Sequence, residues 1–226
     1  MTSNPSNVAA FFDLDRTLIE VNSGAYYAFY EWRNGEITHR QFLKSILWMA
    51  LYHFSLIDME KAFDQAVRHY EGLPERELRQ RTEDFFHQYV TSAIQPGALH
   101  ALQSHRQQGH PLVLLTASST YLSECVAQHW DLDAILANHF PTDDQGHLLG
   151  EFEDPFCYGE GKVHRARRWA EEANVDLSRS YFYSDSLSDL PMLEVVDNPR
   201  IVNPDPRLQR VAQRRGWPIL DWTKAQ

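Results

Sequence analysis

The chain has 226 residues with 21 Lys and Arg against 31 Asp and Glu, a formal net charge of −10, and 43% hydrophobic residues. These values are typical of a globular protein with room for one α/β domain and an inserted subdomain. The acidic balance argues against a nucleic-acid partner, because non-specific affinity for nucleic acid comes from clustered Lys and Arg.

Cys125 and Cys157 are the only cysteines, and we expect both to be reduced thiols in a cytoplasmic protein. The first residues lack the basic and apolar regions of a secretory signal. The most apolar window, 46–57, contains His53 and Ser55 and is too short to span a membrane. We expect a buried helix there, with an interfacial helix as the alternative, and no membrane partner.

The hydrophobic period changes along the chain. The apolar run Val8 to Phe12 predicts a buried strand, and residues 22 to about 90 show a helical period throughout. Beyond Pro96 and Gly97, helical segments alternate with apolar runs, and a hairpin is expected over 140–152. The predicted strands are 112–115, 134–137, 181–184 and 200–203.

This order predicts an α/β protein with a doubly wound, Rossmann-like parallel sheet and an inserted all-helical subdomain. The core is expected over 1–20 and 92–226 and the insert over 21–91. In such a sheet, ligands bind at the carboxyl ends of the strands. Polar side chains that follow each apolar run are therefore the candidates for a functional site.

Asp13 and Asp15 follow the first predicted strand. Two residues apart on an extended segment, they point to the same side and repel each other. Such a pair holds a divalent cation or keeps one member protonated. An Asx-rich turn is the alternative for this pattern taken alone.

Thr116, Ala117 and Ser118 follow the second predicted strand and precede a helix, whose free N–H groups would suit an anion. A simple helix cap is the alternative. Lys162 is expected in the first turn of another helix, where a cation opposes the helix dipole, so an anion beside it is indicated. The segment is not a phosphate-binding P-loop, because Phe156 stands where the first glycine is required.

Asp185 and Asp189 follow the strand predicted at 181–184. A capping box with Ser186 would explain Asp189 but not Asp185. Carboxylates, a hydroxyl and a lysine at successive strand ends are together what Mg²⁺-assisted phosphoryl transfer needs. A receiver-like signalling domain phosphorylated on Asp is the alternative of another class, although such a domain has its phosphoacceptor on a later strand and lacks the insert.

The sequence resembles the haloacid dehalogenase-like (HAD) phosphatases, specifically their phosphoserine-phosphatase-like branch, subfamily IB. The four family motifs occur in order from Asp13 to Asp189, and the helical insert corresponds to the cap of that branch. The resemblance implies that Asp13 is the nucleophile and forms an aspartyl-phosphate. It also implies that Asp15 protonates the leaving alcohol and then activates water, which argues for phosphoester hydrolysis.

The same resemblance implies the remaining roles. Mg²⁺ would be bound by the Asp13 carboxylate, the Asp15 backbone carbonyl and Asp185. Asp189 would position Lys162 or a metal-bound water. The small phosphate ester would contact residues from three motifs, namely Arg16, Thr116, Ala117, Ser118 and Lys162.

Some positions depart from the phosphoserine phosphatase pattern. Arg16 replaces the usual Ser, and Thr116-Ala117-Ser118 replaces Ser-Gly-Gly. Asn22 stands where those enzymes have a Glu for the substrate's amino group, and no Arg between Gln41 and Val67 could hold its carboxylate.

These departures favour an ester that carries an amine but no carboxylate. Between residues 107 and 161 there are nine Asp and Glu and no Lys or Arg, a field that favours an organic cation. The best match among substrates of the branch is L-histidinol phosphate, whose ring could pack on Tyr26, Phe29 or Trp48. Phosphoserine, phosphocholine and phosphoethanolamine are the alternatives.

The eleven histidines add little. The spacing of His100, His105 and His110 does not place ligands on one helix face, so no zinc site is predicted. Most of the histidines are expected at the surface.

Overall fold

The computed structural model describes residues 7–53 and 59–223. Its centre is a parallel sheet with the strand order β3-β2-β1-β4-β5-β6. The order runs in opposite directions from β1, so the topological switch point lies between β1 and β4. The predicted α/β fold with a doubly wound sheet is confirmed. The strands are β1 (Ala10–Phe12), β2 (Leu112–Ser119), β3 (Ala134–Asn138), β4 (Tyr181–Ser184), β5 (Asn198–Val202) and β6 (Ile219–Leu220).

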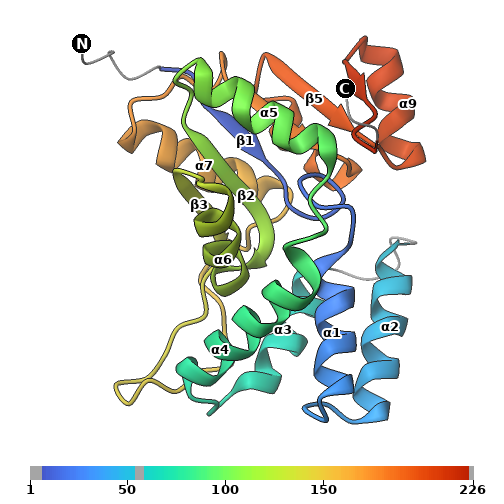
Figure 1. Ribbon diagram of the computed structural model, residues 1–226, viewed down its shortest axis with the longest axis vertical. Coiled ribbons are helices and arrows are strands. Elements are labelled where there is room, and N and C mark those ends of the chain that lie inside the picture. Colours follow the sequence, from blue (N-terminus) through green and yellow to red (C-terminus); the bar gives the residue numbers. More distant parts are fainter. Residues whose placement is uncertain (1–6, 54–58, 224–226) are drawn as a thin grey trace.

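Both faces of β1 are buried, which is why its sequence is continuously apolar. Phe12 belongs to a cluster on one face with Leu102 of α5 (Pro96–Gln107) and Val126 of α6 (Thr120–Trp130). Phe11 belongs to a cluster on the other face with Val163 of α7 (Glu160–Glu172). α9 (Pro206–Arg215) packs on this second face too. Figure 1 shows the sheet held between these helices.

Helices follow one another between β1 and α5, as the period predicts. They are α1 (Ser23–Arg33), α2 (His39–His53), α3 (Met59–Val67) and α4 (Glu75–Phe85), with short helical turns at 68–70 and 86–90. The Asn22 side chain caps α1 by accepting a hydrogen bond from the Ala25 N–H (2.9 Å). In Figure 1 these helices lie below the carboxyl ends of β1 and β2.

The expectation of a buried helix over 46–57 is wrong for its described side chains. Leu43, Ile46 and Leu47 of α2 are exposed, with 65%, 42% and 56% of their surface accessible. The helix packs against α1 along one side, where Phe42 stacks on Trp32 at 4.9 Å, while Leu43, Ile46 and Leu47 face outward. Residues 54–57 of the predicted helix lie outside the described part. In that part, no helix is long and apolar enough to cross a membrane.

The expected hairpin over 140–152 is confirmed as a short one around a turn at 143–146. The antiparallel bridge Thr142 to Leu148 joins its arms, with backbone hydrogen bonds from the Asp143 N–H to the His147 carbonyl (2.8 Å) and from the Leu149 N–H to the Pro141 carbonyl (3.0 Å). One arm also pairs with the loop before α4, where the Leu148 N–H donates to the Leu73 carbonyl (2.9 Å). Gly150 has a left-handed φ of 70°, and a Cβ there would lie 2.9 Å from the Glu71 Cβ.

Two other boundaries differ from expectation. β2 continues to Ser119, beyond the predicted end at Leu115, because its last residues still pair with β3 after a register shift. The helix expected from Ser186 is divided into a turn at 187–189 and the short α8 (Leu190–Leu193). Neither difference moves the polar residues away from the carboxyl edge of the sheet.

Candidate active site

Lys162 joins two acidic residues from separate strand ends. Its Nζ donates to Asp13 Oδ1 (2.8 Å) and lies 2.9 Å from each carboxylate oxygen of Asp189. Lys162 and Asp189 are only 3% and 1% exposed. Two carboxylates therefore compensate a cation in the first turn of α7, where the helix dipole alone would disfavour it. The ammonium group holds the ends of β1 and β4 together.

Asp13 and the nearby Asp185 are hard to ionise where they lie. Burial raises the pKa of Asp13 to about 7, although Lys162 opposes the shift. Burial also raises the pKa of Asp185 well above its ordinary value, and the charges of Asp13 and Asp189 add to this. Burial alone would lower the pKa of Lys162, but the same two carboxylates outweigh it and keep the lysine charged.

These surroundings fit a divalent cation. Asp13 and Asp185 place two carboxylates within mutual electrostatic influence, and the backbone carbonyl of Asp15 belongs to the same loop. Oxygen donors of this kind are the ligands that Mg²⁺ prefers. Among the described residues, no group of three or more His, Cys, Asp or Glu side chains could hold a metal ion. The expected magnesium site does not require such a group, because its ligands are two carboxylates and one backbone carbonyl.

Asp15 is held by the first helix of the insert. Its Oδ1 accepts a hydrogen bond from the Ser23 N–H (2.8 Å), in the first turn of α1. Burial raises the pKa of Asp15, and the contacts with Ser23 oppose that rise. The orientation of this carboxylate is therefore tied to the position of α1.

Arg16 lies exposed at the edge of the cluster with a left-handed φ of 56°. Its unusual backbone is supported by Gln95, whose Nε2 donates to the carbonyls of Arg16 (2.9 Å) and Thr17 (2.8 Å). Asn203 at the end of β5 in turn contacts Gln95 Oε1 (2.5 Å). The charge of Arg16 lowers the pKa of Asp15 and of Asp185, so its guanidinium lies within electrostatic reach of both. Among the described residues, it forms no ion pair with either carboxylate.

Thr116, Ala117 and Ser118 lie at the carboxyl end of β2, next to β1 in the sheet. Thr116 is buried, and its Oγ1 accepts the Ser118 N–H (3.1 Å). Asn138 of β3 fixes the loop, because its Nδ2 donates to the Ala117 carbonyl (2.7 Å). Its Oδ1 also accepts the Cys157 N–H (2.8 Å) and so links this loop to the approach of α7.

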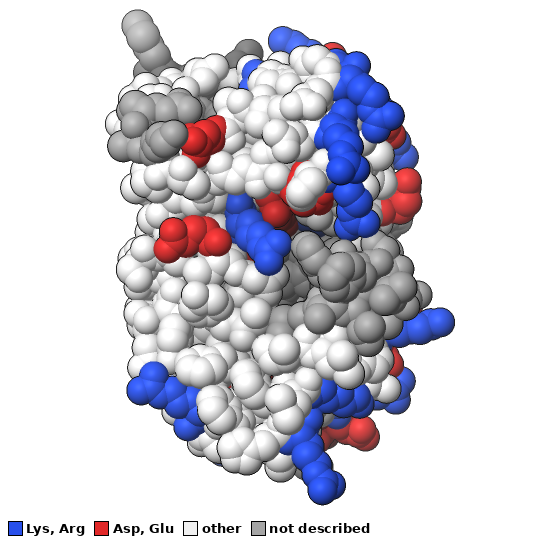
Figure 2. Space-filling view, turned by 90° about the vertical axis from the view of Figure 1, so that its right-hand side faces the viewer, with Lys and Arg blue, Asp and Glu red and all other residues white. Residues whose placement is uncertain are grey.

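The space-filling view shows where this edge reaches the surface. In Figure 2, basic and acidic side chains meet at mid-height, between the upper core and the lower helices. Elsewhere on this face, basic side chains gather at the upper right and along the lower margin, and much of the remaining surface is uncharged.

Comparisons with known proteins identify the family of the chain. The family model for haloacid dehalogenase-like hydrolases matches residues 10–194. The chain belongs to this family. As a member of it, the chain is an enzyme of the phosphatase class, because phosphatase is the activity named for several similar proteins. This finding decides against the receiver-like alternative.

Among three relatives of this haloacid dehalogenase-like hydrolase, two have names that carry a substrate, and these two substrates differ. An inhibition of morphological differentiation protein of Streptomyces azureus is 31% identical over 95% of this chain and 78% of its own length. A phosphoserine phosphatase of Mycobacterium tuberculosis is 30% identical over 96% and 72%. A histidinol-phosphatase of Neisseria meningitidis is 26% identical over 94% and 98%.

Solved structures support the fold of the family. A protein of unknown function from Bordetella pertussis superposes with a TM-score of 0.87 at 28% identity, over 95% of this chain and 98% of that one. A substrate-bound phosphoserine phosphatase superposes with a TM-score of 0.69 at 16% identity, over 99% and 96%.

Several polar residues of the hydrolase site were missed by sequence reasoning. Ser184 donates from Oγ to Asp189 Oδ2 (2.7 Å), and Ser23, Gln95 and Asn138 make the contacts described above. Ser184 carried a usable signal, because it ends a predicted strand next to Asp185. Gln95 and Asn138 bond to residues far away in sequence, and the contact of Ser23 with Asp15 depends on the path of the loop before α1, so these three carried none.

Proposed function

We propose that the chain is a Mg²⁺-dependent phosphomonoesterase that forms an aspartyl-phosphate on Asp13. The buried contact of the Lys162 ammonium with Asp13 Oδ1 carries this proposal. It orients one carboxylate oxygen and leaves Oδ2 as the candidate nucleophilic atom. Lys162 also supplies positive charge where the transferring phosphoryl group gains negative charge.

The residues that would hold Mg²⁺ are Asp13, Asp185 and the backbone carbonyl of Asp15. A bound Mg²⁺ would offset the repulsion between the carboxylates and the charge of the phosphoryl group. Asp189 holds Lys162 in place, with Ser184 holding Asp189.

Asp15 is the proposed proton carrier. Its carboxyl group, whose pKa burial raises, would protonate the leaving alcohol and then take a proton from water. The Ser23 N–H keeps one oxygen occupied, so Oδ2 is the atom available for the transfer. Arg16, Thr116, Ala117 and Ser118 are the proposed contacts of the phosphate ester around this centre.

Helices α1 to α4, within residues 21–91, are the proposed cap over the catalytic edge, and 1–20 with 92–226 the catalytic core. A cavity of about 350 Å³ lies between α3 and the loop before α7. Its walls include Glu60, Asp154 and Glu160, with the rings of Phe156 and Tyr158. The acidic, aromatic lining supports an organic cation as part of the substrate.

The substrate proposed is a small phosphate ester bearing an amine, with L-histidinol phosphate first. Tyr26 and Phe29 of α1 are 42% and 37% exposed and so available to a ring. The ring of Trp48 already has a cationic neighbour, because the Lys44 ammonium lies 5.6 Å from its centre. Phosphoserine is the second candidate, because one relative bears that name.

A substrate panel tests this choice. We expect kcat/KM for histidinol phosphate to exceed that for phosphoserine, phosphocholine and phosphoethanolamine. Asp154→Asn and Glu160→Gln should raise KM for the amine-bearing ester and leave KM for p-nitrophenyl phosphate unchanged, with Glu172→Gln as the control. A ten-fold preference for phosphoserine, about 1.4 kcal/mol, would contradict the proposal.

A further inference from the structure

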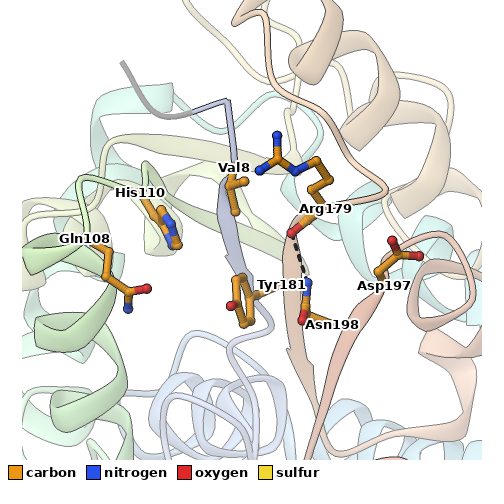
Figure 3. A pocket seen from close by; sticks show the side chains of 7 residues that line it. All are labelled: Val8, Gln108, His110, Arg179, Tyr181, Asp197 and Asn198. Carbon is orange, nitrogen blue, oxygen red and sulfur yellow. Dashed lines mark hydrogen bonds between the residues drawn. The ribbon is translucent and has the colours of Figure 1, made fainter. Parts of the chain in front are cut away.

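A second cavity lies at the opposite edge of the sheet from the catalytic residues. It has a volume of about 490 Å³ and opens at the amino ends of β1, β4 and β5. Figure 3 shows its lining side chains: Val8, Gln108, His110, Arg179, Tyr181, Asp197 and Asn198. We call it the amino-end pocket. Nothing in the proposed reaction uses it.

The pocket carries separate positive and negative groups. Arg179 and Asp197 are exposed at its rim, and Figure 3 shows the guanidinium and the carboxylate at different places around the opening. Among the described residues they form no ion pair with each other. Arg179 Nη1 donates to Asn7 Oδ1 (3.2 Å), while the neighbouring acid Asp176 is already bound by Ser178.

An aromatic surface, formed by Tyr181 and His110, lies to one side of these charges (Figure 3). The ring of Tyr181 is half-buried, with the imidazole of His110 stacked at 5.8 Å and the guanidinium of Arg200 at 5.1 Å. His110 Nδ1 is engaged by His105 Nδ1 (2.9 Å), which leaves Nε2 of His110 for a ligand. This part of the pocket accepts a flat group.

His105 makes the floor rigid. It is an exception to the expectation that most histidines lie at the surface, because it is 3% exposed and its Nε2 pairs with the Tyr183 hydroxyl (2.9 Å). Burial lowers the pKa of His105 to about 4, so the ring is neutral at physiological pH. The His110, His105 and Tyr183 side chains thus form a fixed, uncharged support.

We propose that the amino-end pocket binds a free α-amino acid with a planar side chain. The Arg179 guanidinium matches the planar geometry of a carboxylate and can bind it through two hydrogen bonds. The Asp197 carboxylate takes the ammonium group, and the side chain packs on Tyr181 and His110. An inorganic anion would use Arg179 alone, so the paired charges favour a zwitterion.

The site is separate from the catalytic edge although the same strands reach both. β4 begins at Tyr181 in the pocket and ends at Ser184, which contacts Asp189. Three residue steps of a strand span about 10 Å. A ligand of the amino-end pocket therefore does not compete with the phosphate ester for Asp13.

Calorimetric titration of the full chain tests the proposal. L-Histidine and L-phenylalanine are expected to bind with a dissociation constant below about 1 mM. L-Alanine should bind at least ten-fold more weakly, because it lacks the planar group. Acetate, imidazole and inorganic phosphate each lack one of the required groups and should bind more weakly than either planar amino acid.

Single substitutions test whether the amino acid binds in the amino-end pocket. Arg179→Gln and Asp197→Asn should each weaken it at least ten-fold without changing the circular dichroism spectrum. Arg167→Gln, an exposed arginine on α7, should leave it unchanged. Asp13→Asn should also leave it unchanged. No measurable binding, equal binding by phosphate, or loss in Asp13→Asn rather than Arg179→Gln would overturn the proposal.

Discussion

The catalytic edge of the core and the interior of the helical insert each bury a carboxyl group with a raised pKa, yet their surroundings differ. Asp13 contacts Lys162, and the negative charges of nearby carboxylates add to the rise of its pKa. Glu31 of α1 is 5% exposed and accepts a hydrogen bond from the neutral Tyr70 hydroxyl (2.9 Å). Burial raises the pKa of each to about 7.

The difference shows that a raised pKa alone does not identify a catalytic residue. Around Asp13, a buried cation and further carboxylates form the site that we propose for a phosphoryl group and a metal ion. Around Glu31, packing with Tyr27, Tyr70 and α4 leaves a single acid in a mostly uncharged interior, with Arg81 turned toward Glu36 and Glu77. We therefore expect substitutions in the first region to change catalysis and in the second to change stability.

The largest effect is expected for Asp13→Asn. An amide cannot act as the nucleophile, so kcat should fall by about 10⁵-fold. Steady-state hydrolysis of p-nitrophenyl phosphate with Mg²⁺ measures this, and Glu31→Gln is the matched control for loss of a buried acid. Similar losses in both variants would remove the distinction between the two regions.

Asp15→Asn is expected to lower kcat by about 10²–10⁴-fold, because the proton carrier is lost while the nucleophile stays. Single-turnover kinetics should show that both phosphorylation and release are slower. Metal affinity should change little, since the proposed ligand from this residue is its backbone carbonyl. Unchanged rates would assign proton transfer to another group.

Lys162→Ala and Asp189→Asn should each lower kcat by about 10²–10³-fold, since the lysine stabilises developing charge and Asp189 holds it. The double variant should lose little more than the worse single variant. Lys61→Ala, an exposed lysine on α3, is the control. Fully additive losses would contradict the proposed action of Asp189 through Lys162.

Glu31→Gln should have the smallest catalytic effect and a clear effect on stability. The folded-state pKa of about 7 lies above the ordinary 4.5, so the unfolded chain ionises first as pH rises. The free energy of unfolding should therefore fall between pH 4.5 and 7, with a contribution from Glu31 of about 3 kcal/mol. Urea denaturation at pH 5 and 8 measures the free energy of unfolding. In Glu31→Gln, this free energy should fall by about 3 kcal/mol less between the two pH values than in the unsubstituted chain.

The comparison also explains what the sequence could predict. Asp13, Lys162 and Asp189 follow apolar strands or begin a helix, so local pattern and strand order were enough to bring them together. The contact of Ser23 with Asp15 depends on how the insert packs, and that of Gln95 with Arg16 joins residues far apart in the chain. No local signal marks either contact.

The burial of side chains on helices was also poorly predicted from the sequence. The apolar face of α2 predicted a buried helix, but periodicity gives a face and not its partner, and Leu43 and Leu47 are exposed. His105 shows the reverse case, because it is buried although most histidines were expected at the surface. Its partner, the Tyr183 hydroxyl, is 78 residues away, and no local pattern marks that contact.

Rapid acid quench followed by mass spectrometry tests the central claim most directly. During turnover with Mg²⁺, the peptide that contains Asp13 should carry one phosphoryl group on that residue, and the signal should disappear with EDTA. The matching peptide from Asp13→Asn should carry none. A phosphoryl group on Asp185, or turnover by the Asp13→Asn variant, would contradict the account.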